Sequence, residues 1–151
     1  MQQLNHVAVW VAGIVHFLLG AVWYTVLGKT WMAAIGKTEE QMHSEHGNSP
    51  LPYIVALGGA LIVAYTIAWL LPKVGAPSPN SGAKLGATLS LALIATTMAM
   101  NYGFEARPVV LWVINAGYMV LGMAMMGVII GAWTKSVTPA SSRRDKTAWH
   151  R

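Results

Sequence analysis

The chain contains no cysteine and very little charge. The lack of cysteine excludes disulfides, thiolate metal centres and a cysteine nucleophile. Only 10% of the residues are charged and 55% are hydrophobic, whereas ordinary soluble domains are roughly 25% charged. Lys, Arg, Asp and Glu are missing from four long stretches, which a soluble fold could not leave so bare. These shortages indicate an integral membrane protein.

Four apolar segments are long enough to cross a bilayer, since about 20 residues at ~1.5 Å each span a ~30 Å hydrocarbon core. A chain of 151 residues is one domain on length alone. We therefore expect an all-α integral membrane four-helix bundle over residues 1–134, followed by a basic cytoplasmic tail, 135–151. The expected spans are residues 5–27, 51–71, 82–101 and 109–133.

The polar connection between the first two spans carries the signals of a short helix. Thr38 and Gln41 have the spacing of a capping box, in which each side chain bonds a free backbone N–H group. We expect Glu39–His46 to form a short interfacial helix outside the hydrocarbon. Before it, we expect Thr30 to cap a separate short turn that Gly36 ends.

Three of the four expected spans carry small residues at four-residue spacing. Such residues let backbones approach closely in lipid, where packing rather than the hydrophobic effect holds helices together. We therefore expect a compact bundle. The small residues are Ala56, Ala60, Ala64 and Ala68 on the second span, Gly82, Gly86 and Ser90 on the third, and Gly127 and Gly131 on the fourth.

The basic residues divide unevenly between the two sides of the membrane. Four spans place the N-terminus, the middle connection and the tail on one side, which holds seven Lys and Arg against three on the other. Because positive charge is enriched on the cytoplasmic side, we expect a multi-pass protein of the inner (plasma) membrane with both termini in the cytoplasm. The net charge of +5 then reports topology, and we expect no nucleic-acid partner.

Polar and aromatic side chains gather where the third span ends and the fourth begins. An unpaired amide in hydrocarbon costs several kcal/mol, so we expect Asn115 to face protein and to bond to the first or third span. Two interpretations stay open: hydrogen bonds that only hold helices together, with Glu105 paired to Arg107, or a shallow outward-facing ligand pocket. The candidate ligand-binding residues are Trp23, Tyr24, Asn101, Glu105, Arg107, Asn115 and Tyr118.

His16 lies at the midpoint of the first span. An ionisable residue at that depth is a functional candidate because it is costly to place there. The structural alternative is a neutral imidazole bonded to a backbone carbonyl or to a threonine, with Thr96 and Thr97 as candidate partners. Haem ligation has little support, because His6 lies ~15 Å away along the helix and the other spans lack histidine.

Two sets of residues could bind a metal by their type and spacing, but each is better explained without one. Glu39, His43 and His46 share a helix face and suit zinc, but a solvated amphipathic helix explains them as well. Met119 and Met123 share a face that would suit copper, yet methionine also fills gaps between packed helices. The sequence has no Gly-rich phosphate loop, Ser-His-Asp arrangement or paired membrane carboxylates. We expect no metal, no cofactor and no catalytic residue.

Two stretches resemble a known family. They are Phe17–Trp31, FLLGAVWYTVLGKTW, and Thr96–Trp133, which contains NYGFEARP, LWVINAGY and MGVIIGAW. Both are similar to the bacterial membrane family catalogued as domain of unknown function 1761, and the resemblance covers about residues 5–133. It implies a small protein with about four spans, and it implies no activity. The most specific positions are Gly20, Trp23, Tyr24, Lys29, Trp31, Arg107, Asn115, Gly117, Tyr118, Gly127 and Trp133.

Three functions are compatible with these observations. We expect first a structural or accessory subunit, a homo-oligomer or a part of a larger membrane complex, because small-residue faces are frequent and membrane charges are scarce. The alternative is a small carrier or binding protein for an apolar or weakly polar ligand, because Trp, Tyr and Asn side chains converge at one depth. A membrane enzyme ranks last, since no nucleophile and base share a depth.

Overall fold

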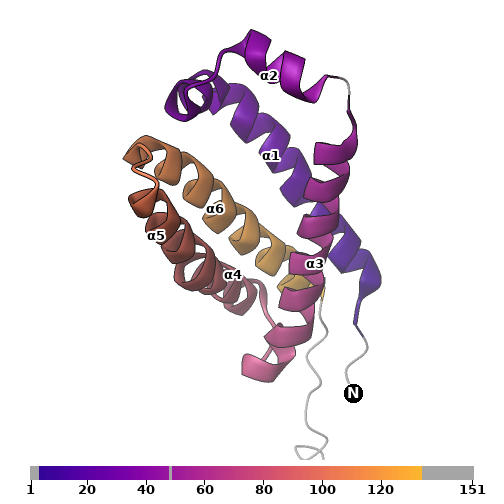
Figure 1. Ribbon diagram of the computed structural model, residues 1–151. Helices are drawn as coiled ribbons and strands as arrows, with labels where there is room; N and C mark the ends of the chain where they lie inside the picture. The colour runs from indigo at the N-terminus through magenta and orange to yellow at the C-terminus, as the bar shows by residue number, and fades with distance from the viewer. Residues whose placement is uncertain (1–3, 48, 134–151) are drawn as a thin grey trace, which may run out of the picture.

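The computed structural model describes residues 4–47 and 49–133, which are almost entirely helical (Figure 1). Four helical segments in this part are long and apolar enough to cross a membrane. The expected all-α four-span fold is confirmed, while the expected tail, 135–151, lies outside the described residues. The elements are α1 (His6–Ile35), α2 (Glu39–His46), α3 (Leu51–Val74), α4 (Pro79–Leu89), η1 (Ser90–Ala95), α5 (Thr96–Phe104) and α6 (Val109–Trp133).

The four segments run alternately up and down, so the first span begins at the level where the last span ends. The Asn5 amide donates to the Trp133 carbonyl oxygen at 3.4 Å. We call this the terminal end of the bundle. The opposite end carries α2 and the connection between α5 and α6, and we call it the α2 end (Figure 1).

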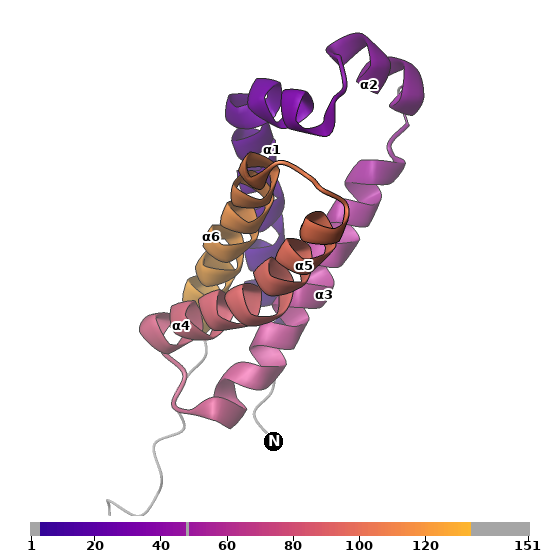
Figure 2. The ribbon, with the colours of Figure 1, turned by 60° about the vertical axis from the view of Figure 1, so that its left-hand side comes forward.

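The first helix is longer than the apolar segment predicts. α1 continues through Thr30 to Ile35 and ends at Gly36, which is left-handed at φ 72°. The expectation that Thr30 caps a separate turn is therefore wrong, because residues 28–35 contain no proline to interrupt the helix. In Figure 2 the last turns of α1 lie across the α2 end instead of continuing along the bundle.

The second and third spans also exceed their expected limits. α3 continues past Pro72 to Val74, with the proline inside its last turn. The third span starts at Pro79, where Ser78 and Ser81 form a capping box, and it runs to Phe104 instead of stopping at residue 101. Ser90–Ala95 within it is a π-helix, η1, a local irregularity that occurs frequently at functional sites.

Backbone contact between glycines joins α4 to α6. A Cβ added to Gly82 would overlap the backbone of Gly127, and one added to Gly86 would overlap the carbonyl of Met123. Gly131 approaches Ser78 in the same way. The small residues on the third and fourth spans therefore face each other, as their spacing predicts.

The apolar core occupies the terminal half of the bundle. The last buried residue of α1 is His16, the first buried residue of α3 is Ala60, and α5 has none. Ala60, Ala64 and Ala68 pack in this core, but Ala56 is exposed, so the alanine face predicted on the second span is only partly used. Towards the α2 end, α3 stands apart from α5 in Figure 1. The α2 half keeps only a few buried apolar side chains, among them Leu111 and Ile114 of α6.

Candidate functional site

Asn115 is the centre of a hydrogen-bond network between three helices. The Tyr24 hydroxyl and the Trp31 indole N–H of α1 both donate to its Oδ1, at 2.9 and 3.1 Å. Its Nδ2 donates to the Tyr102 hydroxyl of α5 at 2.9 Å. The prediction that Asn115 bonds to the first or third span is confirmed for both. We call Tyr24, Trp31, Tyr102 and Asn115 the Asn115 network.

Further side chains reinforce the contacts between these helices. Trp23 donates from its indole N–H to the Ile114 carbonyl at 3.0 Å. The Trp112 indole N–H donates to the Ala95 carbonyl at 2.8 Å, joining α6 to η1. Tyr24 lies edge-on to Trp31 and to Tyr118, with ring centroids 5.7 and 5.6 Å apart. Polar tips and aromatic rings therefore add to the few buried apolar side chains at this depth, such as Leu111 and Ile114.

His16 lies at the base of this aromatic group. Its ring packs against Gly122 and lies 4.7 Å from the Tyr118 ring, whose hydroxyl donates to the His16 carbonyl at 3.3 Å. Only 5% of His16 is exposed, and its Nδ1 has no partner in hydrogen-bond geometry. Thr96 and Thr97 are not its partners, since their hydroxyls bond to Ala92 and Leu93 one turn earlier in their own segment.

The remaining candidate residues lie outside the network. Glu105 and Arg107 bond to each other at 3.0 Å on the exposed connection before α6, as one of the two interpretations expected. Asn101 is exposed on α5. The structure therefore brings together Trp23, Tyr24, Asn115 and Tyr118, but not these three.

The short helix α2 has the limits that its capping residues predict. The Thr38 hydroxyl accepts from the Gln41 N–H, and the Gln41 side chain accepts from the Thr38 N–H. Lys37 pairs with Glu45, which ties the start of this connection to α2. Across the part of the chain that the structure describes, no three His, Cys, Asp or Glu side chains are grouped to hold a metal ion.

Two network residues are absent from the candidates chosen by sequence. Trp31 falls beyond the expected end of the first span, although it lies seven residues, two helical turns, after Tyr24 and so shares its face. Tyr102 belongs to the polar stretch before α6 but was not among the ligand-binding candidates. Extending the expected first helix to Gly36 includes Trp31 and places it on the same face as Tyr24.

Two hydrogen-bond donors of the network are not used within it. Asn115 has a second N–H on Nδ2, and Tyr102 uses its oxygen as an acceptor, which leaves its hydroxyl proton. Among the described residues, neither of these hydrogens has an acceptor within hydrogen-bond distance. Both side chains are only half-buried. A ligand that offers an oxygen acceptor could reach them.

An apolar cavity of about 130 Å³ lies nearer the middle of the bundle, between α3, the third span and α6. Thr66 is the one polar residue in its wall, and its hydroxyl bonds to the Ile62 carbonyl in its own helix. The wall therefore offers no polar group to water or to a charged ligand. The lining residues are Val63, Thr66, Ile67, Leu89, Leu93, Ile94 and Met123.

These features define a small four-span integral membrane protein with a hydrogen-bonded aromatic site at one end. The chain belongs to the family described as protein of unknown function (DUF1761), whose model matches residues 7–131. The resemblance seen in the two sequence stretches is thereby confirmed. No curated protein and no solved structure matches the chain.

Proposed function

We propose that this protein binds a lipid-soluble, weakly polar molecule at the α2 end, next to the Asn115 network. The observation that carries the proposal is the pair of unused donors on Asn115 and Tyr102. They lie in a half of the bundle where α3 and α5 leave side chains uncovered. A donor exposed to hydrocarbon is costly, so a ligand acceptor would stabilise both the ligand and the protein.

The side chains of the Asn115 network suit the binding or carriage of a molecule rather than catalysis. The titratable side chains that form hydrogen bonds within the network are tyrosines, and no nucleophile with an adjacent base is grouped with them among the described residues. Hydrogen-bond donors among aromatic rings suit recognition of an uncharged oxygen acceptor.

Native mass spectrometry of the protein released from vesicles tests this proposal. The vesicles would contain phosphatidylethanolamine, phosphatidylglycerol and a lipid quinone. We expect one retained molecule per chain, and loss of that retention in Asn115→Ala. Thr25→Val is the matched control, because Thr25 bonds only within α1, to the Ala21 carbonyl. Equal retention by the Asn115→Ala and control variants, or none by the original chain, would refute the proposal.

A second candidate function is an accessory subunit that packs with itself or with a partner. A different observation favours it: a Cβ added to Gly58 or Gly59 on α3 would meet nothing within 4 Å, and Ala56 near them is exposed. Small residues on an uncovered helix let a second helix approach. Molar mass in mild detergent tests it: an oligomer dissociated by Gly59→Leu supports this function, and a monomer contradicts it.

A further inference from the structure

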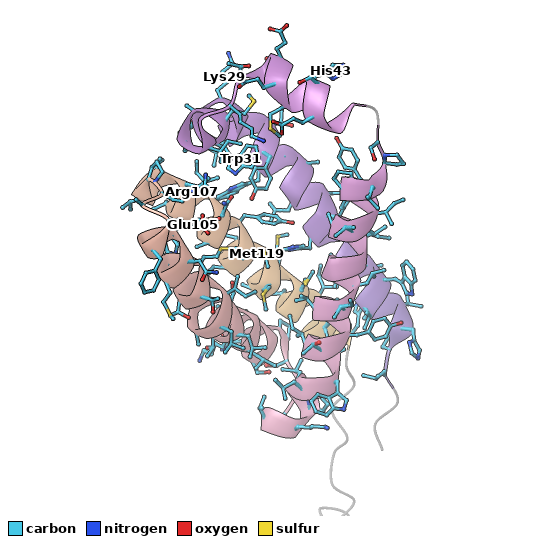
Figure 3. All side chains as sticks on the ribbon, in the orientation of Figure 1. Lys29, Trp31, His43, Glu105, Arg107 and Met119 are labelled. Carbon is cyan, nitrogen blue, oxygen red and sulfur yellow. The ribbon has the colours of Figure 1, made fainter. Side chains whose placement is uncertain are left out.

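The unused donor and the apolar cavity of the bundle lie along one face of α6. Asn115, Met119 and Met123 follow at four-residue spacing, so they share a face of the helix. Figure 3 shows Met119 between α6 and α3, and it packs against the core cluster. Asn115 carries an unused donor at one end of this row, and Met123 lines the apolar cavity at the other. Eight residues of helix separate them by about 12 Å.

The depth of each feature matches a different part of a membrane lipid. Asn115 lies about 9 Å inside the first residue of α6, in the outer part of a leaflet's hydrocarbon. Met123 lies near the middle of α6, where the ends of acyl chains meet. An acceptor beside Asn115 and a chain end beside Met123 are therefore in the order in which a lipid carries them.

We propose that this face holds one ester-linked phospholipid from the leaflet at the α2 end. An ester carbonyl accepts from the Asn115 amide and the Tyr102 hydroxyl, and the acyl chain passes Met119 to fill the cavity. This inference rests on the proposed binding function and names its ligand class. A hydrocarbon chain suits the cavity because its wall has no free polar group.

Lys29 is an exposed cation at the α2 end, where it suits the phosphate of such a lipid (Figure 3). Arg107 is labelled at the same end but pairs with Glu105. The lipid would enter sideways, since residues 51–59 of α3 include no buried side chain and α5 has none. Entry needs no opening of the α4–α6 contact, which the glycines close.

Competition between an ester lipid and its ether analogue tests the carbonyl contact. Dioleoyl phosphatidylcholine and the same lipid with ether linkages would be offered in equal amounts, and bound lipid would be counted by native mass spectrometry. The original chain should retain the ester form at least about fivefold better, because even one additional net hydrogen bond has that value. In Tyr102→Phe the preference should be smaller, because the carbonyl then keeps only the Asn115 donor. A ratio of one in the original chain would overturn the inference.

Filling the cavity tests the chain contact independently. Val63→Phe should lower retention of both lipids, because Val63 lines the cavity, while Ile62→Phe, on the exposed side of the same helix, should not. Equal effects of the two variants would contradict the placement of the chain. If the quinone is retained and phospholipids are not, this inference fails while the proposed function stands. If nothing is retained, both fail.

Discussion

The Tyr24 hydroxyl of α1 donates to the Asn115 side chain of α6 across 2.9 Å. On α1, His16 is the last buried residue, and the side chains that bond to Asn115 follow it in the sequence. The terminal half is held by close backbone packing and an apolar core, whereas the α2 half combines a few buried apolar side chains with interhelical hydrogen bonds. This division determines how the protein should respond to substitution.

Removing the Asn115 side chain should destabilise the α2 half measurably. Interhelical hydrogen bonds in membranes contribute on the order of 0.6 kcal/mol each, and Asn115 makes three. Asn115→Ala should therefore lower the free energy of unfolding by about 2 kcal/mol, and Asn115→Asp by more, because it introduces a charge in hydrocarbon. Reversible unfolding in mixed micelles measures both. An effect no larger than that of Thr25→Val would disprove this assignment.

A methyl group on Gly127 should separate α4 from α6. Its Cβ would overlap the Gly82 carbonyl, which is backbone and cannot rotate away. Overpacking of this kind costs roughly 1–3 kcal/mol, so Gly127→Ala should lose that much stability. Gly103→Ala is the control, because a Cβ there meets nothing within 4 Å. Comparable unfolding midpoints for the two variants would show that the helices are not in glycine contact.

Because His16 and Gly122 are in contact, the effects of substituting them on the free energy of unfolding should not be additive. A Cβ on Gly122 would overlap the imidazole ring, so Gly122→Ala should be strongly destabilising in the original chain. It should cost much less in a His16→Ala background, since the ring is gone. A coupling of about 0.5–3 kcal/mol is expected for residues in contact. Additive effects would mean that the ring lies elsewhere in the folded protein.

Cysteine labelling should establish the orientation in the membrane. The chain has no cysteine, so single replacements need no background removal. Glu40→Cys on α2 should react with an impermeant reagent added outside intact cells. Ala76→Cys, in the connection between α3 and α4, should react only after lysis, because we expect the side with the excess of Lys and Arg to be cytoplasmic. The reverse pattern would invert the proposed topology.

Hydropathy predicts that four helices exist but not where they end. Thr30 is polar, yet a polar residue does not stop a helix whose backbone is fully bonded, and α1 ends only at the left-handed Gly36. The start of the third span at Pro79 depends on the capping box of Ser78 and Ser81. Counting apolar residues along the chain does not detect this local signal. The π-helix Ser90–Ala95 has no evident signal in its sequence, SLALIA.

The orientation of Asn115 was predictable from the sequence, because an amide within the membrane has few possible hydrogen-bond partners. Lipid offers an amide no partner, so Asn115 had to face another span. The partners of His16 were not predictable, because threonine hydroxyls also bond within their own helix, as Thr96 and Thr97 do. The apolar cavity depends on how α3 and η1 pack, which spacing along the chain does not specify.

The double-mutant cycle between Tyr24→Phe and Asn115→Ala in lipid tests most directly whether Asn115 joins the first and last spans. Tyr24→Phe removes only the hydroxyl that donates to Asn115. The structure predicts a coupling in the free energy of unfolding of about 0.6 kcal/mol, with ~1.7 kcal/mol as the upper end for such bonds. A coupling of zero, with both single variants folded, would contradict it.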